Sequence, residues 1–355
     1  MTRTPFYTKL AHILICLIAI TYIGIVGKLV LEPLAFALLF ALLMLPFAEF
    51  FERKCRFPRG LAAMTVMVIF GAIIGALFFI LLGQLSELAK DFPAFHAQLL
   101  NAINDIQNWI ASTFDIDNSA QISYINEAAN GAMGEGTVVL GAMLLSVSSL
   151  IMFLVFTFLY ALFILMYRRL LYRAVSGLFA DEHIEVVSDA VVQIRHVVKK
   201  YVSGLFIQML IVSALACTAF SILGIKYAIL LGLIAGIFNI IPYVGIFSAL
   251  LLAALVTFAT AGGSDVLWVL ISVVIIHAID SNIVMPKVVG SQVKINPLMA
   301  LLGLVVGEMI WGIKGMFLSI PFMAVLKIIF DRVNGLHSWG VFFGEDEKEQ
   351  VSDER

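Results

Sequence analysis

Long apolar segments recur along the chain, and polar or charged residues separate them. A membrane-spanning helix needs about 20 predominantly apolar residues to cross roughly 30 Å of hydrocarbon. Six segments approach or exceed this length: residues 10–31, 34–51, 61–83, 138–167, 202–223 and 266–286. The pattern predicts an all-α polytopic membrane protein with about six full spans. Glu32 and Pro33 are expected to form the turn between the first two spans.

Residues 227–330 contain an internal repeat. The sequence LLGLIAG at residues 230–236 returns 71 positions later as LLGLVVG, and GIF at residues 245–247 returns 70 positions later as GMF. Each copy has one apolar limb, a break and a second apolar limb, with the breaks at residues 242–245 and 312–315. The sequence therefore predicts two helical hairpins in addition to the spans, or eight or more hydrophobic segments in total.

The limbs of these hairpins are short for membrane spans. Residues 227–241 would rise about 22 Å as an α-helix, which is less than the roughly 30 Å of hydrocarbon. Paired short segments that glycine or proline interrupts point to the binding site of a secondary transporter, because broken backbone at membrane depth lines a cavity or is buried in protein. Two interpretations stay open: re-entrant hairpins, or four short tilted spans joined by ordinary turns.

Each hairpin follows a long apolar segment, residues 202–223 in the first copy and 266–286 in the second. The repeated unit is therefore one crossing plus one hairpin. If each hairpin enters and leaves on the same side, the two units begin on opposite sides of the membrane. This predicts an inverted repeat in the C-terminal half, the plan of many secondary transporters.

The composition excludes a soluble globular protein. Of the 355 residues, 62% are hydrophobic and 13% are charged, whereas soluble domains carry about 25% charged residues. The three cysteines, Cys16, Cys55 and Cys217, predict reduced thiols rather than a disulfide framework. The first apolar segment is too long for a cleaved signal peptide and resembles an uncleaved anchor. An integral membrane protein is the class that remains.

Positive charges are unevenly distributed and predict the orientation. Residues 52–60 hold four basic side chains and the N-terminal tail holds Arg3 and Lys9, so the positive-inside rule places both segments in the cytoplasm. Residues 84–136 hold one basic residue, Lys90, against seven acidic residues, which favours an extracytoplasmic position. The hairpins contribute an even number of passes, so the C-terminus is also predicted to be cytoplasmic.

These segments divide the chain into six parts. They are three N-terminal spans (1–83), an extracytoplasmic amphipathic helical insert (84–137), the fourth span (138–167), cytoplasmic or interfacial amphipathic helices (168–201), a repeat-containing transport core (202–330) and a cytoplasmic tail (331–355). In the insert, apolar residues from Leu85 to Trp109 step by three and four, which predicts a helical packing seam. The seam suits packing on the protein's own membrane helices and contact with a second subunit equally.

Polar and ionisable side chains inside the apolar segments are the candidate site residues, because such groups are costly in a membrane and mark functional sites. They are Gln208, Asn239, His277, Asp280, Asn282, Glu308 and Lys314. His277 and Asp280 are three positions apart, so they share a helix face and are able to pass a proton or hold a cation. Lys314 is expected to supply a pairing charge for Glu308 or Asp280. The alternatives are a structural helix–helix hydrogen bond for Asp280 and a snorkelling position for Lys314.

The breaks of the hairpins add backbone groups to this set. Pro242, Gly245, Gly312 and Gly315 interrupt the limbs, and the freed N–H and C=O groups offer ligands to a polar solute or an ion. The chain has no GxxxxGKS/T, HExxH or GxSxG motif and no paired-cysteine metal pattern, so neither an ATPase nor an enzyme is predicted. No cofactor is expected, and H⁺ or Na⁺ is the candidate coupling ion.

Four motifs in the C-terminal half resemble successive signatures of the autoinducer-2 exporter (AI-2E) family, the PerM-like permeases. They are NIIPYVG at residues 239–245, DSNIVMPKVVG at 280–290, INPL at 295–298 and WGIKGMFLSIP at 311–321. Family sequences commonly carry a proline after the Gly245 equivalent and another about two turns on, where this chain has Ile246 and Leu252. The resemblance is close over residues 201–330.

The resemblance implies a multipass transporter of the bacterial inner (cytoplasmic) membrane that forms homo-oligomers. Family members are assigned to export of the quorum-sensing furanone autoinducer-2 or to sodium(lithium)/proton antiport. Three functions therefore stand as hypotheses: a secondary transporter that exports a small polar solute such as autoinducer-2 through the hairpin site, such an antiporter, and a non-transporting membrane scaffold. The expected partners are the lipid bilayer, the solute or a monovalent cation, and further copies of the chain, but no nucleic acid.

Overall fold

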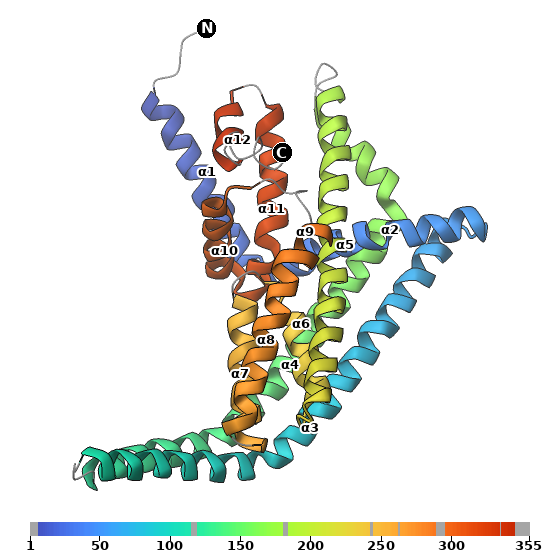
Figure 1. Cartoon of the computed structure of the whole chain (residues 1–355). Helices are drawn as coiled ribbons and strands as arrows, with labels where there is room; N and C mark the ends of the chain where they lie inside the picture. Colours follow the sequence, from blue (N-terminus) through green and yellow to red (C-terminus); the bar gives the residue numbers. More distant parts are fainter. Residues whose placement is uncertain are drawn as a thin grey trace, which may run out of the picture. The chain divides into compact units, whose positions relative to one another are not determined.

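The described part of the chain is helical. The computed structural model describes the backbone of residues 6–114, 119–179, 184–241, 244–261, 263–288, 295–333 and 335–344. Within these residues every regular element is a helix and none is a strand (Figure 1). The predicted all-α fold class is therefore confirmed.

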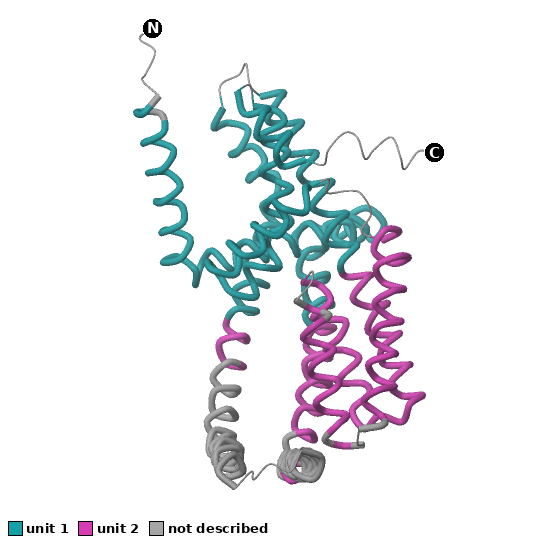
Figure 2. The backbone as a smooth tube through the Cα atoms, turned by 60° about the vertical axis from the view of Figure 1, so that its left-hand side comes forward, with its two compact units in different colours: residues 1–71, 153–205, 289–355 teal, residues 72–152, 206–288 magenta. Residues whose placement is uncertain are grey.

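Two compact units make up the chain, and each is built from segments that are distant in sequence (Figure 2). Unit 1 comprises residues 1–71, 153–205 and 289–355, and unit 2 comprises residues 72–152 and 206–288. Three long helices contribute to both units: α3 (Arg59–Phe114), α4 (Ser119–Ser176) and α5 (Ile184–Ile222).

Unit 1 packs its N-terminal helices against its C-terminal ones. Besides parts of α3, α4 and α5, it contains α1 (Phe6–Val26), α2 (Lys28–Lys54), α10 (Pro297–Trp311), α11 (Ile313–Arg332) and α12 (His337–Phe343). The α1 helix contacts α2 and α10, while α2, α10 and α12 all contact α11. Phe36 of α2 stacks on Phe317 of α11, with ring centroids 5.2 Å apart. The second hairpin, α10 with α11, is thus anchored on α2.

Unit 2 holds the first hairpin and the helix that follows it. Its elements include α6 (Ala228–Phe238), α7 (Val244–Ala261), α8 (Gly263–Ile279), a π-helical turn (Asp280–Val284) and α9 (Met285–Val288). The α7 helix contacts both α6 and α8. Buried apolar side chains of these helices and of α5 form one core, in which Phe220 and Val269 are fully buried.

Six helices in the described residues are long and apolar enough to cross a membrane. They lie at Lys28–Lys54, Arg59–Leu88, Val147–Ser176, Ile184–Ile222, Asp265–Val288 and Ile313–Arg332. Five of them overlap spans that the sequence predicts, and the sixth is the second limb of the second hairpin. The prediction of a polytopic membrane protein is therefore confirmed.

A corner at Gly27 interrupts the first predicted span, so the predicted turn at Glu32 and Pro33 is wrong. The α1 helix ends just before Gly27 and α2 begins just after it, with Pro33 inside α2. A Cβ at Gly27 would lie 2.8 Å from the carbonyl oxygen of Ile23, so glycine permits this corner. Apolar residues continue on both sides of Gly27, which is why the hydrophobic pattern does not reveal the corner.

The two hairpins differ in the length of their limbs. In the first, α6 has 11 residues and α7 has 18, and in the second, α10 has 15 and α11 has 20. At 1.5 Å per residue, α6 rises about 16 Å, roughly half the hydrocarbon thickness. The two limbs of each hairpin pack on each other. These lengths favour a re-entrant path for α6, whereas α11 is long enough to span.

The six-part division of the chain stays a prediction. The α3 helix continues from the third predicted span into the predicted insert, and α4 continues from the insert through the fourth predicted span. Leu88, a member of the predicted seam, packs against the core of unit 2. The seam side chains from Phe92 to Trp109 and the tail from residue 345 lie outside the described residues.

Candidate functional site

Asp280 is the centre of a polar site in unit 2. This aspartate follows the last residue of α8 and begins the π-helical turn. Its side chain is buried among apolar helices, with only 5% of the residue surface exposed. A π-turn places one extra residue in a helix, and such turns are frequent at functional sites. Both the π-turn and the burial therefore indicate Asp280 as a candidate functional residue.

Two amide side chains hold the Asp280 carboxylate. The amide nitrogen of Gln208 on α5 lies 3.0 Å from Oδ1 and 2.9 Å from Oδ2, and the amide nitrogen of Asn239 lies 2.9 Å from Oδ2. Gln208 is itself buried. Both donors are neutral, so these bonds stabilise the carboxylate without cancelling its charge. Such a carboxylate is able to exchange amide partners for the hydroxyl groups of a solute or for a cation.

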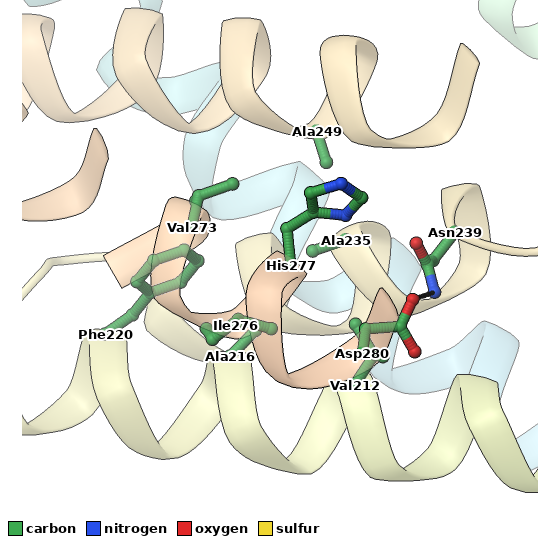
Figure 3. A pocket seen from close by; sticks show the side chains of 10 residues that line it. All are labelled: Val212, Ala216, Phe220, Ala235, Asn239, Ala249, Val273, Ile276, His277 and Asp280. Atoms are coloured by element: carbon green, nitrogen blue, oxygen red, sulfur yellow. Dashed lines mark hydrogen bonds between the residues drawn. The ribbon is translucent and has the colours of Figure 1, made fainter. Parts of the chain in front are cut away.

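A small cavity adjoins the carboxylate (Figure 3). Its volume is about 30 Å³, enough for one or two water molecules. The polar lining residues are Asn239, His277 and Asp280, and the apolar ones are Val212, Ala216, Phe220, Ala235, Ala249, Val273 and Ile276. Figure 3 shows His277 and Asp280 on the same helix, with Asn239 directed at the carboxylate. His277 is exposed, and its Nε2 lies 3.3 Å from the hydroxyl oxygen of Ser281.

Two glycines bring α6 close to α5. A Cβ at Gly232 would lie 2.5 Å from the backbone nitrogen of Cys217, and a Cβ at Gly236 would overlap the Ser213 hydroxyl. Small residues four positions apart allow this backbone approach between membrane helices. Because Asn239 directly follows α6, this packing brings its amide to the carboxylate site on the neighbouring helices.

The chain turns sharply between α6 and α7. Gly245 donates its N–H to the carbonyl of Ile241 at 3.0 Å. A Cβ at Gly245 would overlap the carbonyl of Phe238, so only glycine lets α7 begin so close to the end of α6. Gly245 therefore lies in the first turn of the second limb rather than in the break itself. Pro242 lies outside the described residues.

The tip of the second hairpin lies in unit 1 and has different partners. Lys314 donates from Nζ to Oε2 of Glu32 at 2.8 Å, and the same nitrogen lies 4.1 Å from the ring centre of Phe153. The indole N–H of Trp311 donates to the carbonyl of Gly24 at 2.9 Å. The tip of the second hairpin therefore contacts α1 through Gly24, α2 through Glu32 and α4 through Phe153.

The predicted partners of Lys314 are therefore wrong. Its ammonium group pairs with Glu32 rather than with Glu308 or Asp280, and Glu308 is exposed on α10. Sequence analysis missed Glu32 because it assigned that residue to a turn. The available signal was a lone acidic residue within an apolar run, which is costly in a membrane unless paired.

The other predicted site residues are distributed over both units. The structure brings Asn239, His277 and Asp280 to one pocket and Gln208 to the carboxylate. Asn282 is exposed and donates to the Ala278 carbonyl of its own helix. Besides Pro242 and Gly245 of the first hairpin, the remaining residues belong to the second hairpin in unit 1: Glu308, Gly312, Lys314 and Gly315. Of these, Gly312 forms the break, with a φ of 61°, and Gly315 lies in the first turn of α11.

Replacing Lys314 by methionine is expected to destabilise unit 1. The Glu32 side chain, 11% exposed, would lose its ion-pair partner, but Lys314 is 38% exposed and solvent already screens the pair. We expect a loss of about 1–2 kcal/mol, between the values for surface and buried pairs. Thermal unfolding of the purified protein in detergent measures this loss.

Two further variants define the contribution of the Lys314–Glu32 pair. Adding Glu32→Gln to Lys314→Met should recover part of the stability, because no unpaired carboxylate then remains buried. Lys28→Met, which removes an exposed lysine of α2, should change the melting temperature little. A Lys314→Met variant as stable as wild type would show that the ion pair contributes nothing.

Comparisons with known proteins agree over most of the chain. The profile of a family described as "AI-2E family transporter" matches residues 12–335. The Bacillus subtilis protein named "Putative transport protein YrrI" is 28% identical over 316 residues, which cover 86% of this chain and 87% of the relative. The Escherichia coli protein named "AI-2 transport protein TqsA" is 24% identical over 331 residues, which cover 90% of this chain and 91% of the relative.

The matched region includes both hairpins and every side chain around Asp280. It also contains most of the length of the helices that are able to cross a membrane. From the family match and these helices together, we conclude that this chain belongs to the AI-2E transporter family and is an integral membrane protein.

Proposed function

We propose that this protein is a secondary transporter and that Asp280, Gln208 and Asn239 bind its cargo. The observation that carries the proposal is the Asp280 carboxylate, which is 5% exposed and is held by two amides within a bundle of apolar helices. Ionisable groups at such positions are costly and mark substrate or ion pathways in membrane proteins. His277, which lines the same pocket, supplies a further polar group.

A small hydroxylated solute suits these groups. A carboxylate accepts hydrogen bonds from two neighbouring hydroxyls, and an amide both donates and accepts. Autoinducer-2 is the proposed cargo and export the proposed direction, because of the family resemblance and because AI-2 transport stands in the name of TqsA. The cavity of about 30 Å³ is too small for such a solute. The proposal therefore requires a second conformation in which α8 and the first hairpin separate.

The internal repeat supports a cargo-binding role for Gln208 and Asp280. Gln208 and Asp280 are 72 positions apart, and the repeated segments of the hairpins are 70 and 71 positions apart. The two residues thus occupy equivalent positions of the two copies to within one or two residues. If a two-fold axis relates the two copies, residues at equivalent positions contact each other where they lie on that axis. Transporters with inverted repeats bind cargo at the interface of the repeats near the bilayer midplane.

Flux measurements in proteoliposomes test this proposal. We expect the purified protein to accelerate the flux of autoinducer-2 over that in protein-free liposomes. An imposed proton or sodium gradient should change the rate, because a secondary transporter couples cargo to an ion gradient. Competition by other small hydroxylated solutes then defines the cargo chemistry. Flux equal to that of protein-free liposomes for every solute, with and without a gradient, would contradict the proposal.

Cation/proton exchange is the second candidate function. The small volume of the cavity suits a monovalent ion, and His277 and Asp280 both line it. Exchange predicts sodium- or lithium-dependent pH changes inside proteoliposomes in the absence of any organic solute, and Asp280→Asn should abolish them. Solute flux without such pH changes would exclude this candidate and favour the first.

Location and assembly complete the proposal. We place the protein in a bacterial inner membrane with both termini in the cytoplasm, on the basis of the distribution of basic residues and of the family resemblance. Homo-oligomeric assembly rests on the same resemblance. A non-transporting scaffold receives no support from the relatives, because those compared above are named as transport proteins.

A further inference from the structure

Basic side chains gather where α2 meets α3 and where α4 ends. Residues 49–59 and 168–173 contain seven basic and two acidic residues. Both acidic residues are ion-paired, Glu52 with Arg168 at 2.7 Å and Glu49 with Arg195 at 3.3 Å. Five basic side chains of these segments are exposed and are called the basic patch below: Arg53, Lys54, Arg56, Arg169 and Arg173. The surface therefore carries a large excess of positive charge.

The two segments that form the basic patch lie side by side in unit 1. The ion pair between Arg168 and Glu52 joins the end of α4 to the end of α2. At the start of α3, a Cβ at Gly60 would lie 3.6 Å from the terminal methyl of Met166 on α4. Basic residues from both segments therefore contribute to one surface.

This surface lies at the boundary of the membrane. Both α2 and α3 are long and apolar enough to span, and only residues 55–58 connect them, so the corner cannot lie far from the lipid headgroups. The candidate span of α4 likewise ends near the patch, at Ser176. Exposed aromatic side chains occur on the same segments or directly beside them: Phe50, Phe57, Tyr167 and Tyr172. Aromatic residues with basic neighbours are typical of the membrane–water interface.

Arg56 holds a backbone conformation that arginine rarely adopts. Its φ is 56°, and it is the one non-glycine residue with positive φ in the described part of the chain. The residue follows Cys55, the C-cap of α2, and here the carbonyl of Phe51 accepts from the N–H of Cys55 at 3.2 Å and from that of Phe57 at 3.3 Å. Glycine is the usual residue in this position, because a Cβ is strained there. An arginine at a strained position points to a role for its side chain.

We propose that the basic patch binds the phosphate group of an anionic phospholipid. Guanidinium groups form paired, charge-assisted hydrogen bonds with phosphate oxygens. Basic clusters beside membrane helices attract anionic headgroups. The patch belongs to unit 1, and the candidate transport site belongs to unit 2. The inference therefore goes beyond the proposed transport function and does not depend on it.

Thermal unfolding of the full chain in detergent tests the lipid site. Phosphatidylglycerol should raise the melting temperature, and phosphatidylcholine with the same acyl chains should not. The phosphatidylglycerol concentration that gives half of the shift should rise about fivefold for each patch arginine replaced by glutamine. Arg56→Gly gives opposite signs in two measurements. It should raise the melting temperature without lipid by about 2 °C, because the strain is removed, and should weaken the response to phosphatidylglycerol.

Two controls separate a lipid site from general electrostatics. Lys90→Gln removes an exposed positive charge from α3 in unit 2 and should leave the lipid response unchanged. Soluble glycerol phosphate should not reproduce the shift, because acyl chains hold the headgroup at the membrane boundary. Three results would each overturn the proposal: equal stabilisation by phosphatidylcholine, a Lys90→Gln effect as large as that of Arg56→Gln, or the full shift with glycerol phosphate.

Discussion

Replacing Asp280 by asparagine should abolish most transport while leaving the protein folded. Asparagine has nearly the same shape, and its carbonyl oxygen still accepts a hydrogen bond from Gln208 or Asn239, which both contact the carboxylate. The negative charge is lost, however, and with it the charge-assisted hydrogen bond to cargo or the attraction for a cation. A bond of this kind contributes about 1.5–3 kcal/mol, so flux should fall about 10- to 100-fold. Proteoliposome flux and the melting temperature are measured together.

Asp280→Ala should add a loss of stability to the loss of transport. Alanine offers no acceptor, so the amide of Gln208, which is buried, and that of Asn239 would lose their partner. Unsatisfied buried donors cost about 1–3 kcal/mol each, and we expect a total loss of about 2–4 kcal/mol. The difference in melting temperature between the alanine and asparagine variants therefore measures the structural part of the role of Asp280.

Asn282→Ala provides the matched control for these variants. Asn282 was a sequence candidate two positions from Asp280, but it is exposed and bonds only the Ala278 carbonyl in the described contacts. Its replacement should leave flux within about twofold of wild type, since no contact with the pocket is lost. Wild-type flux in Asp280→Asn would instead mean that Asp280 is a structural hydrogen-bond partner, the alternative that the sequence leaves open.

Length and polarity explain how much of the fold could be predicted from the sequence. Five predicted spans overlap membrane-competent helices, because an apolar segment of sufficient length has few other stable states in a protein of this composition. The repeat also predicted both hairpins, because each copy has glycine or proline residues that interrupt the apolar sequence and would not occur together inside a continuous helix. The corner at Gly27 was missed because it depends on the close approach of Gly27 to the carbonyl of Ile23, which leaves no mark on the hydrophobic pattern.

The site was predictable as a set of residue types but not as a set of partners. Gln208, Asn239 and Asp280 stood out because polar groups in apolar segments need partners. Their grouping depends on the close packing of α6 on α5 through Gly232 and Gly236, which sequence spacing does not reveal. For Lys314 the predicted partners were wrong. Its observed partner, Glu32, lies 282 positions away in the chain, and no local pattern relates the two residues.

The two copies of the repeat use their shared glycines differently. Gly236 of the first copy packs against Ser213 of α5, whereas its equivalent, Gly307, packs against Gly315 of α11. Only the glycine at the start of the second limb has the same role in both copies. Gly245 and Gly315 each lie against a carbonyl of the preceding limb. The feature that the repeat preserves in both copies is therefore the close approach of the two limbs within each hairpin.

Valine at Gly245 or Gly315 should prevent its hairpin from closing. A Cβ at Gly245 would overlap the carbonyl of Phe238, and a Cβ at Gly315 would overlap that of Gly307. Backbone atoms cannot move aside unless the limbs separate, so the cost should exceed the about 1–3 kcal/mol of ordinary overpacking. We expect a melting temperature lower by roughly 10 °C, or a loss of the monodisperse peak in size-exclusion chromatography.

Gly312→Ala tests whether the limb contact, rather than glycine itself, is what each hairpin requires. Gly312 has a φ of 61°, but nothing lies within 4 Å of a Cβ placed there. Alanine therefore meets backbone strain alone, about 1–3 kcal/mol, and should lower the melting temperature less than Gly315→Val does. Equal losses in the two variants would assign the requirement to the conformation of the break. If Gly315→Val alone unfolds the hairpin, the second hairpin depends on the backbone contact between its two limbs, and any conformational change of the protein must move these two limbs together.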